Sequence, residues 1–456
     1  MPGASLLTDS LGNPVTLDDA TSLAALNDFV EGFISCEARV ANILRVAATD
    51  HSPLVQACCA ALHMFAESGT AVLNASPYIQ RALAGLGASR GITQREQGFV
   101  AAVAAWVDGD IPQAIRLHEQ QARDFPRDLA SLKLGQYHMF NVGNSPGMLR
   151  LALSALPAAA DVPYLHGMAA FAWEQCHLLE QAEAAARRAL DLCHKEPWAQ
   201  HALAHVMLTQ GRLTEGLAFM RQVSPTWTAL NSFMVTHNWW HLAVFALELG
   251  QHEEVLRLYD QQVWGVVKDY SQDQIGAVSL LARLELAGVD VVERWQDVAD
   301  HLALRLDDHV LPFLDMQYLY GLARAGRPQA QTLMQNIEAF AHGQATPADS
   351  DSKRVWQQVC IPASRGLLAH ADGDYSRAVQ ELGSALPRLM EIGGSHAQRD
   401  LFEQIHLDAL VRSGQWVGAQ HLVQQRLRGQ PESTRLQRQA RQVYTALGIA
   451  PEAVSR

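Results

Sequence analysis

Two pairs of histidines in this sequence have a spacing that suits chemistry. His201 and His205 form the first pair, and His237 and His241 form the second. A spacing of four residues puts both side chains of a pair on one face of a helix. Imidazole nitrogens ligate Zn, Fe and Cu ions, and histidine transfers protons near neutral pH. Three interpretations stay open: a metal or acid–base centre, a site for an anionic group, and hydrogen-bonded packing.

No established catalytic motif accompanies these histidines. A zincin metalloprotease needs Glu directly after its first His, where this chain has Ala202 and Asn238. The sequence also lacks the hydrolase elbow, the P-loop and the dinucleotide-binding motif. No motif therefore requires a cofactor. Whether the protein is an enzyme stays open, and an enzyme that uses the four histidines could act with or without a divalent metal.

Other polar side chains are candidates for the same site. His309 and Asp315 lie in the segment DDHVLPFLDMQYL, and Asp308 in that segment is also a suitable helix N-cap. Arg399 and Asp400 follow a Gly-Gly turn at a predicted helix start. The guanidinium of Arg399 suits a carboxylate or phosphate group. The simpler interpretation of this neighbouring pair is a surface salt bridge.

A repeat of fixed length predicts the elements that position these residues. Short turn segments begin at residues 109, 143, 178 and 211, and their equivalent positions are 34 residues apart: Ala114, Met148, Ala182 and Gly216. This is the period of the tetratricopeptide repeat, a pair of helices joined by a turn. Small residues such as Ala102, Ala170 and Ala189 fall where the two helices of a unit approach closely.

The same unit continues with a looser period toward the C-terminus. Its turns are predicted at five further glycines: Gly250, Gly288, Gly326, Gly373 and Gly414. No stretch alternates with period two, so no sheet is expected, and residues 343–355 are expected to form an exposed loop. The predicted fold is an all-α, tetratricopeptide-like α-solenoid of about nine or ten helical hairpins, tightly curled. The predicted segments are a partly helical N-terminal part (1–53), the repeat array (54–431) and a capping helix with a tail (432–456).

The match to this repeat also implies a binding face. The first helix of each tetratricopeptide unit lines the concave side, and the register places His201, His205, His237, Trp240 and His241 there. We therefore expect a concave groove that holds a small acidic molecule or a peptide segment.

Composition excludes several classes of partner. The 456 residues include 35 Lys and Arg against 47 Asp and Glu, a net charge of −12. This charge opposes binding to nucleic acid and to anionic membranes. No apolar run reaches the roughly 20 residues of a membrane span, and no secretory signal is visible. The six cysteines form no C-x-x-C pair, which favours a cytoplasmic protein.

Several long segments resemble one family. They include WAQHALAHVMLTQGRLTEGLAFM, THNWWHLAVFALELGQHEEVLRLYD, DDHVLPFLDMQYL and GGSHAQRD. Between about residues 54 and 429 the chain resembles the tetratricopeptide repeat protein 38 family. The resemblance implies a helical repeat array and a cytoplasmic protein. It marks as hallmarks His201, His205, His237, Asn238, Trp240, His241 and residues 393–400.

The resemblance brings no biochemical activity with it. The leading functional prediction is a binding module whose pocket is lined by His, Trp and Arg side chains. The alternative is an enzyme that uses the histidine cluster on a small substrate, and a homo-oligomeric adaptor is a third class.

Overall fold

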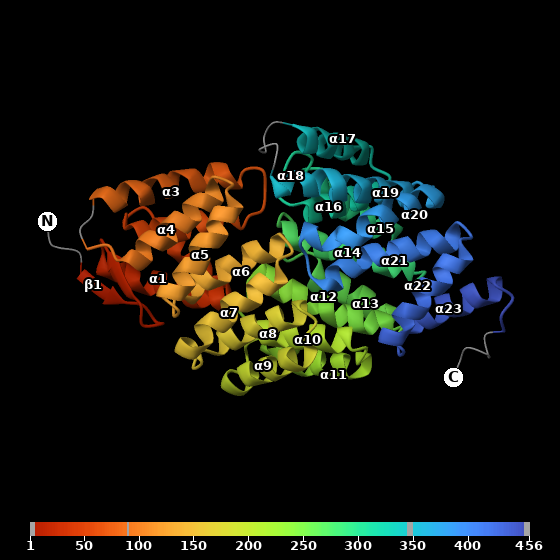
Figure 1. The fold of residues 1–456 in the computed structure, drawn as a ribbon, viewed down its shortest axis with the longest axis horizontal. Helices are drawn as coiled ribbons and strands as arrows, with labels where there is room; N and C mark the ends of the chain where they lie inside the picture. Colours follow the sequence, from red (N-terminus) through yellow and green to blue (C-terminus); the bar gives the residue numbers. More distant parts are fainter. Residues whose placement is uncertain (1–4, 89–90, 344–349, 451–456) are drawn as a thin grey trace. The chain divides into compact units, whose positions relative to one another are not determined.

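A computed structural model describes residues 5–88, 91–343 and 350–450. This part of the chain forms 23 α-helices and one two-stranded hairpin (Figure 1). It divides into two compact units, Met1–Leu203 with Thr226–Val235, and Ala204–Pro225 with Thr236–Arg456. Helices α10 (Pro197–Thr209) and α12 (Ser232–Glu248) continue across the division, so both units share them. The all-α prediction is confirmed, while the segment bounds at 53 and 431 stay a prediction.

The first unit begins with a short antiparallel hairpin, where no sheet was expected. Strand β1 (Ser5–Thr8) pairs with β2 (Pro14–Leu17). The Asp9 carboxylate accepts hydrogen bonds from the backbone N–H groups of Leu11 and Asn13, and this stabilises the turn. The prediction was wrong here because strands of four residues are too short to show a clear alternation.

Helices fill the rest of the first unit. After the hairpin come α1 (Leu23–Ile34), a 3₁₀ segment (Ala38–Arg45), α2 (Pro53–Met64) and α3 (Ala71–Ala88). Three regular hairpins follow: α4 (Gln94–Val107) with α5 (Ile111–Asp124), α6 (Leu129–Asn141) with α7 (Ser145–Ala159), and α8 (Pro163–Gln175) with α9 (Leu179–Leu192). From α4 to α9 each helix packs against the next one, as in a tetratricopeptide-type array.

The second unit continues the pattern of hairpins. Besides its parts of α10 and α12 it contains α11 (Leu213–Val223), α13 (His252–Leu258), α14 (Ser271–Leu286), α15 (Val292–Leu302), α16 (Pro312–Arg324), α17 (Gln329–His342), α18 (Asp351–Val355), α19 (Ile361–Ala371), α20 (Tyr375–Ala385), α21 (His396–Arg412), α22 (Trp416–Gly429) and α23 (Thr434–Ala446). From α2–α3 to α21–α22 the described residues form ten successive helix pairs, in line with the number predicted.

Part of the loop expected over residues 343–355 is a short helix. Residues 344–349 lie outside the described residues. Residues 351–355 form the short helix α18, whose first turn is capped by the Ser350 hydroxyl accepting from the Lys353 N–H. The loop prediction was therefore wrong over this helix, because its five residues show no apolar period.

The predicted turns and close contacts are confirmed. The turn glycines have φ between 68° and 88°, in the left-handed region, at Gly109, Gly143, Gly211, Gly250, Gly288, Gly326, Gly373 and Gly414. Ala102, Ala170 and Ala189 are fully buried. A Cβ atom added to Gly216 would lie 2.3 Å from the Phe245 ring, so this position leaves no room for a side chain.

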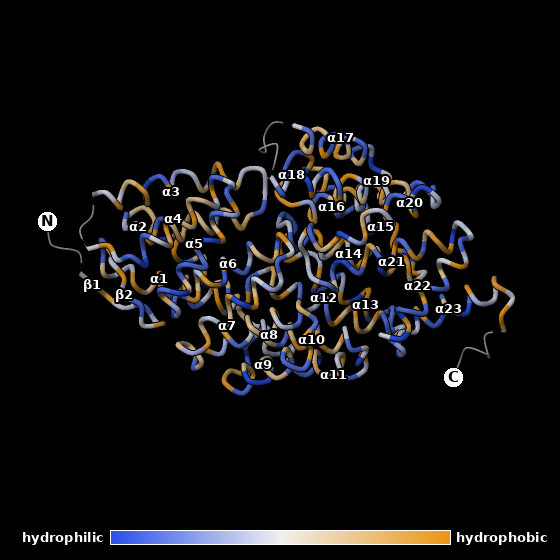
Figure 2. The backbone as a smooth tube through the Cα atoms, viewed as in Figure 1, coloured by the Kyte–Doolittle hydropathy of each residue, from blue (hydrophilic) through white to orange (hydrophobic). Residues whose placement is uncertain are grey.

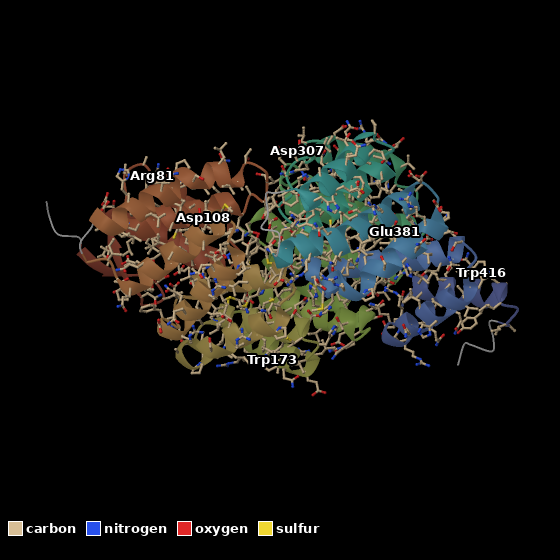
Figure 3. All side chains as sticks on the ribbon, turned by 45° about the horizontal axis from the view of Figure 1, so that its top comes forward. Arg81, Asp108, Trp173, Asp307, Glu381 and Trp416 are labelled. Carbon is tan, nitrogen blue, oxygen red and sulfur yellow. The ribbon has the colours of Figure 1, made fainter. Side chains whose placement is uncertain are left out.

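The helices separate apolar from polar residues as the repeat requires. Figure 2 shows hydrophobic and hydrophilic residues alternating along most helices, which is typical of helices with one buried face. Exposed charged side chains such as Arg81, Asp108 and Asp307 lie on the outside of the ribbon (Figure 3). None of the described helices combines the length and the apolar composition that crossing a bilayer demands.

One chemical change is expected to shift stability in opposite directions at two glycines. Gly373 has φ +79° and Gly276 lies within α14, and an added Cβ has no neighbour within 4 Å at either position. Gly373→Ala is expected to lower the free energy of unfolding by about 1 kcal/mol through backbone strain. Gly276→Ala is expected to raise it by roughly 0.5–1 kcal/mol through helix propensity. Urea denaturation measures both, and equal signs would contradict the assigned backbone conformations.

Candidate metal centre

The two histidine pairs lie on the two helices that both units share. His201 and His205 project from α10, and His237 and His241 project from α12. Their neighbours along both helices are apolar and buried, among them Ala202, Leu203, Ala204, Val206, Leu242, Ala243 and Phe245. A helix that is apolar around most of its surface lies inside the protein. The histidines are therefore carried into the interior by helices whose other faces are also covered.

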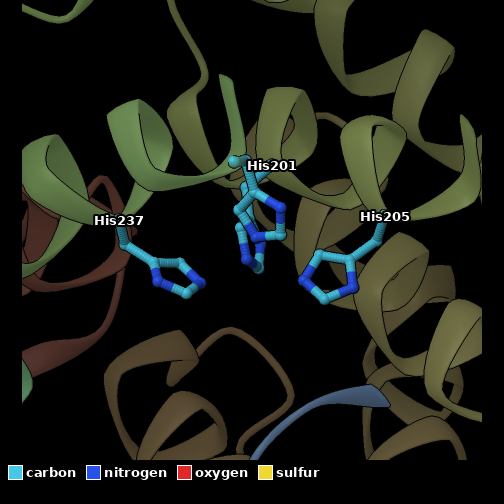
Figure 4. A group of neighbouring side chains, drawn as sticks. His201, His205 and His237 are labelled. Atoms are coloured by element: carbon cyan, nitrogen blue, oxygen red, sulfur yellow. The ribbon is translucent and has the colours of Figure 1, made fainter. Parts of the chain in front are cut away.

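The structure brings the four predicted histidines together. One ligand atom from each ring can be chosen so that all four atoms lie within 4.8 Å of one another. The ring centroids of His205 and His241 are 4.5 Å apart, and those of His237 and His241 are 4.8 Å apart. Figure 4 shows the rings of His201, His205 and His237 turned toward a common point. The exposed fractions of the four residues are 1%, 0%, 7% and 0% in chain order.

Burial also sets the protonation state of His237. Removal from water lowers the pKa of His237 to about 3, and the neighbouring His205 adds to the effect. His237 is therefore a neutral imidazole at physiological pH. Neutral imidazole is the form that binds a metal ion.

Aromatic rings and cations surround two of the four histidines. Trp198 stacks on His201 with centroids 4.7 Å apart, and the Lys133 ammonium lies 5.3 Å from the Trp198 ring centroid. Trp240 stacks on His237 at 5.4 Å with an interplanar angle of 5°. The Arg283 guanidinium lies 5.2 Å from the Trp240 ring centroid. Each tryptophan therefore contacts one histidine and one cation, and the cation lies at a distance typical of a cation–π contact.

Two polar groups on α12 are buried and make no hydrogen bond within the described residues. Asn238 is fully buried, and neither atom of its amide makes a hydrogen bond within the described part of the chain. The Trp240 indole N–H is also buried and makes no hydrogen bond to any described residue. A buried polar group without a partner costs about 1–3 kcal/mol, so such groups in native proteins require an explanation.

Arg399 and Asp400 contact backbone carbonyls and other arginines in the structure. Arg399 donates hydrogen bonds to the carbonyl oxygens of Gly393 and Gly394, and thereby holds the turn before α21. Asp400 accepts from Arg426 at 2.5 Å and lies 3.8 Å from Arg283. Burial raises the pKa of Asp400, but Arg426 and Arg283 outweigh this effect and lower it overall. Through Arg283, Asp400 is linked to Trp240.

His309 and Asp315 form a separate pair. The Nδ1 atom of His309 lies 2.6 Å from a carboxylate oxygen of Asp315, which is fully buried. Burial raises the pKa of Asp315 to about 6, although His309 partly opposes the effect. Among the described residues, only the four histidines contribute ligand atoms to the cluster around His205. The structure therefore does not add His309, Asp315, Arg399 or Asp400 to that group.

Three neighbours of the centre were missed from the sequence. Trp198 precedes His201 by three residues, so its helical spacing could have indicated a shared face. Lys133 and Arg283 come from α6 and α14, far away along the chain. No local pattern connects either cation with the histidines.

The Asp315 pair predicts a pH-dependent stability. Because the pKa of Asp315 is raised in the folded state, the folded chain binds a proton more tightly than the unfolded chain. The contribution of Asp315 to the free energy of unfolding is therefore most favourable below pH 4. It falls between pH 4 and 6 and stays reduced above pH 6. Asp315→Asn is expected to remove this fall. The melting temperature of the variant should therefore rise relative to that of the parent chain between pH 4 and pH 7. Parallel melting-temperature profiles would contradict the prediction.

Comparisons with known proteins identify no family for this chain. No model of a known protein family matches the sequence. A structure of Naa15/Naa10 bound to HypK-THB aligns with 12% identity over 93% of this chain and 67% of the other, at a TM-score of 0.25. The P58(IPK) TPR domain aligns with 9% identity over 71% of this chain and 99% of the other, at a TM-score of 0.19. At such scores neither similarity assigns a function to this chain.

Proposed function

We propose that this helical repeat protein binds a transition-metal ion through His201, His205, His237 and His241. The observation that carries the proposal is the gathering of ligand atoms from four buried imidazoles within 4.8 Å of one another. Imidazole nitrogens are the commonest protein ligands of transition-metal ions, and a tetrahedral ion takes four of them.

The ligand type favours particular ions. Imidazole suits Zn, Cu, Ni and Fe, whereas Mg and Ca prefer oxygen ligands. A tetrahedral ion with bonds of about 2.0 Å separates its ligand nitrogens by about 3.3 Å. The rings therefore close around such an ion by rotations that bring the widest pair nearer by roughly 1.5 Å, a movement within the reach of side chains.

Burial favours a small occupant over a peptide. The sequence predicted either a small acidic molecule or a peptide segment at these residues. The four histidines and Trp240 are at most 7% exposed, so a peptide would have to separate α10 from its neighbours to touch them. An ion needs no such opening, and a small molecule needs less of one.

The bound ion would stabilise the fold, and this role is compatible with a second, catalytic one. It would tie α10 to α12, and binding energy of this kind adds to the free energy of folding. Catalysis is the alternative function, and it requires a coordination position open to a substrate. The resemblance to the tetratricopeptide repeat protein 38 family stays a proposal, supported by hallmark segments that contain both histidine pairs. A cytoplasmic location and homo-oligomers stay predictions.

Elemental analysis tests the proposal. The full chain, dialysed against Zn, Cu, Ni or Fe salts and then freed of loose metal, is expected to keep about one ion per chain. His205→Gln with His241→Gln removes one ligand from each helix, so the retained metal should fall at least tenfold. The parent chain should also gain melting temperature on metal addition, and the variant should not.

A buried histidine outside the centre is the matched control. His118 is fully buried, and burial lowers its pKa to about 3, as for His237. His118→Gln should keep the metal content of the parent chain. The proposal is rejected if the parent chain retains none of the four metals, or if the double variant retains as much as the control.

A further inference from the structure

Resting on the proposed metal site, we infer that the bound ion takes a small anion as an additional ligand. The inference comes from the charge of the site and from the hydrogen-bond donors beside it. It narrows the predicted small acidic ligand to one that coordinates the metal directly.

The four ligands leave the charge of the ion uncompensated. Neutral imidazoles add no negative charge, and the group of ligand atoms contains no carboxylate or thiolate among the described residues. A divalent ion in a buried site then keeps a charge of about +2, and burying an uncompensated charge is unfavourable by many kcal/mol. An anion bound directly to the metal reduces the net charge of the site and therefore the free-energy cost of burying it.

The charged groups around the site do not supply the missing charge. Lys133 and Arg283 each contact a tryptophan that stacks on a metal ligand, and both are cations. Arg283 is balanced by Asp400. Glu196 accepts from the N–H groups of α10's first turn, but burial raises its pKa to about 8, so it is largely neutral at pH 7.

One further carboxylate lies near the start of the second histidine pair. Asp273 accepts hydrogen bonds from the Thr236 hydroxyl at 3.1 Å and from the Val267 N–H at 3.1 Å. These bonds hold it next to the residue that precedes His237. Asp273 is not among the grouped ligand atoms, so it does not neutralise the ion by direct coordination.

Two donors beside the ligands suit a bound anion. The Asn238 amide and the Trp240 indole N–H lie on α12 within one turn of His237 and His241. Both are buried without a hydrogen bond to any described residue. An anion on the metal accepts hydrogen bonds, whereas a neutral apolar molecule leaves both donors unsatisfied. Copper, iron and nickel bind more than four ligands readily, and zinc also expands to five.

Azide is the probe for this inference. The full chain is loaded with Cu(II), freed of excess metal, and titrated with sodium azide. The expected result is a new azide-to-copper charge-transfer band that saturates, together with a change in the copper electron paramagnetic resonance spectrum. Acetonitrile, a neutral ligand of similar size, should produce neither change.

A variant and a clear division of outcomes complete the test. Asn238→Leu keeps the size of the side chain and removes its donor, so copper content should be unchanged while azide affinity falls roughly tenfold. Failure to retain copper overturns the proposed function itself. Copper retention without a spectral response to azide overturns only the anion inference, as does equal binding of acetonitrile. Unchanged azide affinity in the variant overturns the part assigned to Asn238.

Discussion

The contact between α10 and α12 is the constraint on which the centre depends. Both helices are buried on most sides by apolar residues, yet their mutual contact is made by imidazoles, with His205 and His241 rings 4.5 Å apart. Apolar side chains at these four positions would pack at least as well and would avoid the desolvation of polar groups. The four histidines thus place polar groups where the surrounding sequence is otherwise apolar.

The C-terminal helix is fastened to the same element. The Glu248 carboxylate, at the end of α12, accepts hydrogen bonds from the Ser433 hydroxyl and from the Arg435 guanidinium, and both charged side chains are buried. A buried pair of this kind adds little net stability compared with apolar packing. It does specify where α23 docks, since breaking either partner leaves the other charge buried and unpaired.

Regular features of the chain could be predicted from the sequence, and contacts between distant segments could not. The turn segments recur every 34 residues at first and at looser intervals afterwards, so the helix pairs and the shared face of each histidine pair followed from spacing alone. Arg399 was predicted to contact a ligand, and in the structure it also donates to the backbone carbonyls of Gly393 and Gly394. Sequence patterns carry no signal for such backbone acceptors. The β hairpin and α18 were missed because strands of four residues and a helix of five residues are too short to show a clear pattern.

The sharing of α10 and α12 between the two units has a practical consequence for dissecting this protein. Chain divisions near residues 203 and 235 fall inside helices, not in linkers. A fragment ending at either point would lose the hydrogen-bonded continuation of its last helix and expose apolar surface to water. The two halves are thus poor candidates for separate expression, and tags or fusion partners belong at the ends of the chain.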